Sequence, residues 1–433
     1  METAKAFLDA VVTLNSERDN MINLIKEQLS SVIILVGVLA FIICSPAFGQ
    51  SPDSPKPSAL KEPIIQPAID GIFEAFKTHP LVGISDAHGL AQLMEFYNAL
   101  IRDPRFAQNV GNIVVEFGGA ARQNVIDRYV NGEFVPYKNL RQVWTDVVGW
   151  IPTVSHLGYA NFFAQVRQTN KELKTEKRIR VWLGEPPIIW AKVKTREDYY
   201  KFMYRDEHAA KVIIKNILKQ NKKALVIYGG FHFESITEEE RRLREEWSEA
   251  DPKNAGPVSS LGDRIWAEYP DAFFIVETYY GWFGDKSCTN RFEEAIGMES
   301  WQMPVLVTQA SGTALESEAL KCPPPIPIQG SGQYPPTMPK ALQDIERDRL
   351  EAYAKNRSFF SGSNDAVLFL GPAESLTLSP RIPDLYLDEE YRKEIDRHIK
   401  IMGDSYPPGW TGNVPAVTPM SYRSRIDSLY EGQ

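Results

Sequence analysis

Two of the six histidines lie beside carboxylates, just past short apolar stretches of the chain. Asp86 and His88 follow one such stretch, and His232 follows the glycine pair Gly229-Gly230 at the end of another. Imidazole titrates near neutral pH, so a histidine oriented by a carboxylate can take a proton from water. These residue types predict general acid–base chemistry, although Asp86 could instead cap a helix and either histidine could be a buried structural residue.

Charged residues elsewhere could join this chemistry. Glu116 lies in the apolar stretch IVVEF, where an unpaired carboxylate would be costly to bury, so we expect it to meet a partner or water. Arg205 is at the start of a helix-like segment and could point into the same site. Alternatively, this segment could be only a helix start, whose acidic residues interact favourably with the helix dipole. Glu185 could be only a loop carboxylate, and Glu277 only a partner for an arginine or tyrosine.

Short apolar, β-branched runs alternate with amphipathic stretches, which predicts strands separated by helices. The predicted strands are Leu81 to Ile84, Asn112 to Phe117, Arg178 to Leu183, Ala224 to Tyr228, Phe273 to Thr278, Pro304 to Thr308 and Ala366 to Leu370. The predicted helices are Leu90 to Ile101, Ala209 to Gln220, Thr237 to Glu249, Pro339 to Ala354 and Leu387 to Ile401. This pattern indicates an α/β fold, a three-layer sandwich with a mostly parallel central sheet.

Apart from Arg205, which opens a helix before the fourth predicted strand, the candidate residues lie at or just after the ends of these predicted strands. In parallel α/β sheets, ligands bind beyond the carboxyl ends of the strands. We therefore expect His88, Glu116, His232 and Asp86 to converge on one edge of the sheet, with Arg205 beside them.

The chain divides into four parts by composition. Residues 1–49 contain an apolar segment, Val32 to Cys44, followed by the small residues Ala47 and Gly49. They predict a signal peptide or an N-terminal membrane anchor, and hence a periplasmic, secreted or tethered protein that meets the membrane only there. Residues 50–63 read as a Pro/Ser-rich linker, 64–375 as the α/β domain with a Pro-rich loop at 322–339, and 376–433 as a C-terminal helix and tail.

Composition excludes several classes of protein. The chain of 433 residues is 43% hydrophobic and 24% charged, which is ordinary for globular domains. Its 48 basic and 56 acidic residues give a net charge of -8, and no basic run appears, so nucleic-acid binding is not expected. Beyond the apolar segment, Cys288 and Cys322 could form one disulfide or stay free.

The order of motifs resembles a superfamily that joins erythromycin esterases, ChaN-type haem-uptake proteins and Tiki/TraB metalloproteases. It consists of a strand, D-x-H-G at 86–89, a strand with Glu116 near its end, and a strand followed by G-G-x-H at 229–232. The resemblance covers roughly Pro80 to Phe233, with 365–371 as a closing strand. Asp86 stands where the family usually has Glu, and Ser85 occupies a glycine position.

The resemblance implies three alternatives for an exported bacterial protein that acts on a small molecule or peptide. In the first, a metal-independent hydrolase, His88 activates water with support from Glu116 or Asp86, while His232 and Arg205 stabilise the oxyanion. In the second, His88 and His232, together with Glu116 or Asp86, hold Zn²⁺, Mn²⁺ or Co²⁺. In the third, the protein binds haem without catalysis through a histidine or a tyrosine such as Tyr279 or Tyr280. The oligomeric state stays open.

Overall fold

The structure of the protein, a computed structural model, describes residues 62–149, 156–250, 259–281, 286–316, 338–355 and 364–402, all within the unit Leu60–Gln433. The predicted signal peptide or anchor, residues 50–61 of the predicted linker, nearly all of the Pro-rich loop and the tail after Met402 lie outside the described residues. In the described ranges, no helix is both long and apolar enough to cross a membrane.

Eight strands form one sheet in the order β1-β7-β8-β6-β2-β5-β3-β4. β7 runs antiparallel to its neighbours β1 and β8, and every other neighbouring pair is parallel. The strands are β1 (Ile64–Pro67), β2 (Leu81–Ser85), β3 (Asn112–Gly119), β4 (Arg180–Glu185), β5 (Ala224–Tyr228), β6 (Phe273–Thr278), β7 (Val305–Thr308) and β8 (Ala366–Phe369). The predicted α/β class with a mostly parallel sheet is confirmed, and all seven predicted strands are present.

β1 is absent from the strands that the sequence predicts. This strand has four residues, follows a Pro/Ser-rich stretch and ends at Pro67, so its composition resembles the linker before it. Proline is tolerated there because β1 pairs only with β7 and therefore lies at the edge of the sheet.

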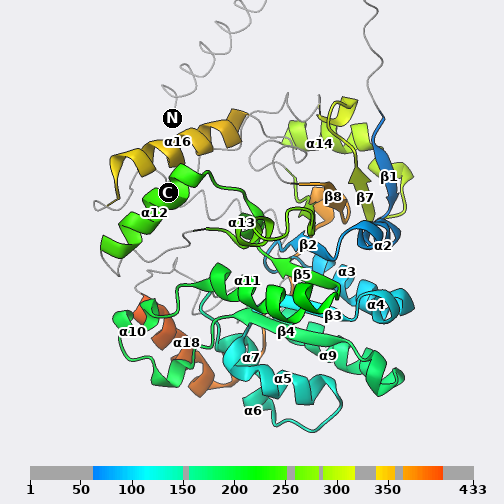
Figure 1. Ribbon diagram of the computed structural model, residues 1–433. Helices are drawn as coiled ribbons and strands as arrows, with labels where there is room; N and C mark the ends of the chain where they lie inside the picture. Colours follow the sequence, from blue (N-terminus) through cyan, green and yellow to red (C-terminus); the bar gives the residue numbers. More distant parts are fainter. Residues whose placement is uncertain are drawn as a thin grey trace, which may run out of the picture. The chain divides into compact units, whose positions relative to one another are not determined.

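Helices cover both faces of the sheet. They are α2 (Ala68–Thr78), α3 (Ala91–Arg102), α4 (Pro104–Asn109), α5 (Gln123–Val130), α6 (Tyr137–Leu140), α7 (Gln142–Thr145), α9 (Leu157–Glu172), α10 (Arg196–Tyr200), α11 (Arg205–Asn216), α12 (Glu238–Ala250), α13 (Leu261–Trp266), α14 (Lys286–Ile296), α16 (Lys340–Lys355), α17 (Asp384–Leu387) and α18 (Glu389–Met402). Each of the five predicted helices has a counterpart among them. In Figure 1, α5, α7 and α9 gather on one side of β4, and α12 and α16 lie alongside each other.

The alternation of side chains along the strands produces two buried layers. Ile84, Val115 and Ile227 face one side, where they pack with residues of α2, α3, α5, α9 and α18. Val114 and Val226 face the other side, where α11 and α13 cover them. Since successive strand residues point to opposite faces, one strand can supply both layers. A third cluster joins α14 to β7 and β8.

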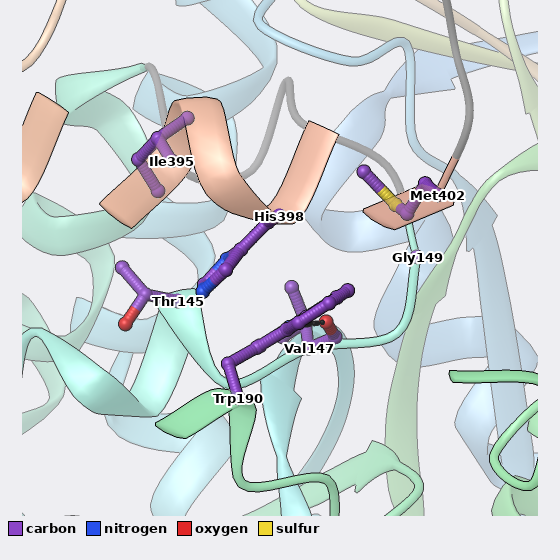
Figure 2. Close-up of a pocket in the computed structure, with 7 residues that line it drawn as sticks. All are labelled: Thr145, Val147, Gly149, Trp190, Ile395, His398 and Met402. Carbon is purple, nitrogen blue, oxygen red and sulfur yellow. Dashed lines mark hydrogen bonds between the residues drawn. The ribbon is translucent and has the colours of Figure 1, made fainter. Parts of the chain in front are cut away.

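The segment after β8 is packed into the first of these layers. Leu378 pairs with Leu90 in an isolated β-bridge, and Ile395 and Met402 of α18 are buried in the core. α18 and the chain around α7 enclose a small pocket whose lining includes His398, and Figure 2 shows this ring lying flat against Trp190. The C-terminal helix is therefore an integral part of the packing.

Candidate active site

The strand register brings the predicted residues to one edge of the sheet. Ser85 at the end of β2 pairs with Tyr228 of β5, and one residue earlier Ile84 pairs with Val276 of β6. Asp86 continues the ladder, since its amide donates to the carbonyl of Tyr228 at 2.8 Å. The residues that follow β2, β5 and β6 therefore meet at the carboxyl ends of the strands, as expected.

Asp86 and His88 form a fixed pair at this edge. His88 Nδ1 lies 2.9 Å from Asp86 Oδ2, and the Tyr159 hydroxyl donates to the same oxygen at 2.8 Å. Tyr97 OH lies 3.5 Å from the other oxygen. The Asp86 side chain is 1% exposed while that of His88 is 30% exposed, so a buried carboxylate holds a histidine that reaches the surface. Asp86 does not cap α3, whose N-cap is Leu90.

The surroundings of His88 favour its protonated form. Burial alone would lower the pKa of the imidazole. The hydrogen bond to Asp86 and the negative charges of Glu116 and Asp86 outweigh burial and raise the pKa of His88 above its ordinary value, despite opposition from His232. Because a carboxylate accepts a hydrogen bond from Nδ1, the neutral ring carries its lone pair on Nε2.

Glu116 is the centre of a second cluster. One oxygen, Oε1, lies 2.6 Å from an Arg205 guanidinium nitrogen and 3.3 Å from His232 Nε2. The other oxygen, Oε2, accepts a hydrogen bond from the Gly229 amide at 2.8 Å. The carboxylate predicted to need a partner inside β3 thus has three, from α11 and from the turn after β5.

Charge balance explains how these groups stay buried. Burial would raise the pKa of Glu116, but His232, His88 and Arg205 together hold it well below its usual range. His232 contacts Asp206 through Nδ1 and Glu116 through Nε2. Burial opposes its charge, yet these two carboxylates raise the pKa of His232 to about 10, so the ring is an imidazolium at neutral pH.

Arg205 links Glu116 to a second buried carboxylate, Glu185. Arg205 Nε donates to Glu185 Oε1 at 2.7 Å, and Glu185 Oε2 accepts from the amides of Val148 and Gly149 at 2.9 and 2.7 Å. Burial and the nearby charge of Glu116 raise the pKa of Glu185, against the effect of Arg205. Glu185, for which the sequence leaves a site role and a loop role open, is the last residue of β4 and ties the chain after α7 to the site.

The glycine pair after β5, Gly229-Gly230, lies between the two clusters. A Cβ built on Gly229 would lie 3.3 Å from His88 Nε2 and 3.6 Å from Glu116 Oε2. A Cβ on Gly230 would lie 2.8 Å from Ser85 Oγ and 3.4 Å from Glu277 Oε2. The absence of side chains at these two positions leaves the polar groups close to the backbone of a short turn.

All five predicted catalytic residues belong to these two clusters, and the sequence missed several of their partners. Asp206 suited the first turn of α11, yet its carboxylate contacts His232. Tyr159 and Tyr97 belong to helices that cover the sheet, and a tyrosine on such a helix is usually an ordinary core residue. No local signal marked the tyrosines, whereas Asp206 lies next to Arg205 in the sequence. His208, two residues after Asp206 on α11, is packed near the ring of Tyr204.

The residues predicted for a metal do not fit one. In the described part of the chain, no three His, Cys, Asp or Glu side chains are grouped to hold a metal ion. Both ring nitrogens of His232 contact carboxylates, which keeps the ring protonated, and a protonated imidazole has no lone pair for a metal.

The two tyrosines predicted for haem directly follow β6, and one cysteine of the predicted disulfide lies outside the described ranges. Tyr279 is fully buried, and its hydroxyl donates to Glu293 at 3.1 Å. Tyr280 is half-buried against the core. Cys288 of α14 is disulfide-bonded, and the other two cysteines, Cys44 and Cys322, lie outside the described residues.

No protein-family model matches the sequence, and no curated protein matches it at a significant level. Among solved structures, a Bacillus cereus protein matches with 12% identity and a TM-score of 0.38 over 70% of this chain and 90% of that one. The type III effector HopBA1 matches with 15% identity and a TM-score of 0.30 over 53% and 93% of the two chains. ChaN of Campylobacter jejuni, with cofacial haem binding, matches with 13% identity and a TM-score of 0.27 over 49% and 86%. With TM-scores below 0.5, none of these likenesses assigns the chain a family or an activity.

Proposed function

We propose that this edge of the sheet is a hydrolase site for an ester or amide bond, in which His88 takes a proton from the attacking water. The observation that carries the proposal is the Asp86–His88 pair. A carboxylate that is itself held by Tyr159 fixes the ring through Nδ1, at a strand end where the ring is 30% exposed. A positioned base of this kind contributes about 10² to 10⁴ in rate.

Water is the direct nucleophile in this proposal. The sequence has no G-x-S-x-G motif that would supply an activated serine. Proton transfer to His88 Nε2 leaves a hydroxide equivalent that bonds to the carbonyl carbon, and Asp86 stabilises the imidazolium that forms.

The second cluster contains two cationic side chains. Arg205 and the protonated His232 are both held by carboxylates, Glu116 between them and Glu185 and Asp206 on their outer sides. Both N–H groups of His232 are directed at carboxylates, so His232 contributes its charge, while the guanidinium of Arg205, with five N–H groups, is fixed in advance to donate when negative charge develops on the carbonyl oxygen. The substrate is a small molecule or a peptide that carries the scissile carbonyl.

The test compares two histidines at the two ends of the same strand. We expect His88→Ala to lower kcat/KM by about 10² to 10⁴ on whichever compound of an ester and anilide panel the wild-type protein hydrolyses. Asp86→Asn should lower it in the same direction. His79→Ala is the matched control. His79 precedes β2, near the amino ends of the parallel strands and away from the candidate site, and contacts Phe274 and Thr78.

An unchanged turnover in His88→Ala would overturn the proposal. So would a protein that hydrolyses nothing on the panel but shifts the Soret band of haemin, with the shift lost in His88→Ala. That result would favour the haem-binding alternative that the sequence motifs imply.

A further inference from the structure

A further carboxylate, Glu277, lies at the same edge and takes no part in the two clusters. It belongs to β6, the neighbour of β2 on the side opposite β5, at the level of Ser85. Its side chain has a hydrogen bond with Ser85, whose backbone carbonyl accepts from Thr278 at 2.6 Å. Glu277 is therefore half-buried and tied to the residue that immediately precedes Asp86.

The surroundings of Glu277 are the opposite of those of Glu116. Glu116 has Arg205 and His232 as partners, whereas the groups that face Glu277 are the Ser85 hydroxyl from β2 and the carboxylate of Glu234 after the turn 230–233. Its pairing position on β8 is the uncharged Val367. Burial, reinforced by Glu234 and only partly offset by Ser85, raises the pKa of Glu277 to about 7.

The glycine pair Gly229-Gly230 lies against both the base His88 and this carboxyl group. A Cβ on Gly229 would approach His88 Nε2, and a Cβ on the next residue, Gly230, would approach Glu277 Oε2 at 3.4 Å. Since consecutive Cα atoms are about 3.8 Å apart, the two groups flank neighbouring positions along one short turn. A substrate bound along this turn, with its scissile bond between the two positions, could contact the base His88 on one side and the acid Glu277 on the other.

We propose that Glu277, held by Ser85, is the general acid that protonates the leaving group in the hydrolysis proposed for this edge. The inference rests on the proposed function. Water loses a proton to His88 Nε2 while its oxygen bonds to the carbonyl carbon. The bond from that carbon to the leaving oxygen or nitrogen then breaks as Glu277 transfers its proton to the leaving atom. His88 returns its proton to solvent and Glu277 takes one up, which restores both groups.

The proposal also defines a class of substrate. An alkoxide or an amide anion leaves poorly unless it is protonated, whereas a p-nitrophenolate leaves without help. A site with a dedicated acid therefore favours alkyl esters or amides, and its acid should matter little for activated esters.

The experiment compares leaving groups in Glu277→Gln, which keeps the shape of the side chain and can still bond to Ser85. We expect kcat/KM for an alkyl ester to fall by about 10² to 10⁴, the usual contribution of a positioned acid. Turnover of the p-nitrophenyl ester with the same acyl group should stay close to the wild-type value. Glu95→Gln, an exposed residue of α3, is the matched control and should change neither.

Two outcomes separate this inference from the proposed function. If His88→Ala loses activity but Glu277→Gln affects both esters equally, or neither, Glu277 is not the acid and the hydrolase proposal stands. If His88→Ala retains activity, the proposed function fails, and this inference fails with it. If Glu277→Gln does not fold, Glu277→Asp keeps an acid one methylene shorter and must show the same dependence on the leaving group.

Discussion

His88 at the sheet edge and His398 on α18 each have a ring nitrogen 2.9 Å from a carboxylate oxygen, yet their environments act in opposite directions. The pKa of His398 is lowered, because burial dominates and its partner Glu394 is shared with Arg397. Its ring stacks on that of Trp190, with the ring centroids 4.1 Å apart and the planes 15° from parallel. Figure 2 shows the two rings facing each other. The pKa of His88 is raised, because Asp86 and Glu116 both act on it.

The comparison shows that a histidine–carboxylate contact does not by itself indicate catalysis. The His398 side chain is 6% exposed, faces an aromatic ring and contributes to packing. The His88 side chain is 30% exposed and lies among charged groups. What separates the two regions is the balance of charge around the ring and its access to solvent.

The largest effect is expected when the arginine of each region is removed, and it is measured as the loss in the free energy of unfolding. Arg205→Met leaves Glu116 and Glu185 buried without their shared cation, so we expect the free energy of unfolding to fall by about 3 to 5 kcal/mol. Arg397→Met should cost about 1 to 3 kcal/mol, since Glu394 is half-exposed and the losses are hydrogen bonds to it and to the carbonyls of Trp190 and Val193. Urea denaturation measures both, and equal losses would contradict the distinction.

The second prediction concerns the replacement of His398 and of His232 by phenylalanine. At His398 the ring is stacked and favours the neutral form, so His398→Phe should cost less than about 1.5 kcal/mol. His232→Phe removes the charge that Asp206 and Glu116 share, and should cost about 3 kcal/mol. Thermal or urea unfolding of the two variants measures the difference, and a tolerated phenylalanine at 232 would show that this ring is not an imidazolium.

The third prediction concerns pH. In the folded protein the pKa of His232 is about 10, above its unfolded value of about 6.5, so its stabilising contribution is complete below pH 6.5 and is lost as the pH rises towards 10. For His398, whose folded pKa is lowered, stability is present above pH 6.5 and is lost as the pH falls below that value. NMR titration of the ring protons should show His232 charged at pH 8 and His398 neutral, and the reverse order would refute the assignment.

The smallest expected effect concerns the surface of the C-terminal region. Lys138 of α6 lies 3.2 Å from Glu390 of α18, but both side chains are more than two-thirds exposed. Lys138→Ala should therefore change the free energy of unfolding by less than about 1 kcal/mol. A larger loss in urea denaturation would mean that this pair, and not the packing around His398, holds α18 in place.

The strands and most helices could be predicted because their signals are local. Runs such as IVVEF at 113–117 and LVIY at 225–228 identify buried strands from composition alone, and the chain after each one marks the edge where ligands meet a parallel sheet. The same reasoning found His88, Glu116 and His232. It could not find β1, because a short edge strand beside prolines has no distinctive pattern.

The sequence alone determined seven of the eight strands of the described sheet and that the candidate side chains come together near their ends. Only the tertiary structure decided the partners: Tyr159 on Asp86, Arg205 between Glu116 and Glu185, and Glu277 beside a serine and another carboxylate. Apolar periodicity is set by neighbours in the chain, whereas these contacts join residues far apart in it through the order of the strands. The charge around each side chain, and hence its chemistry, follows from those distant neighbours.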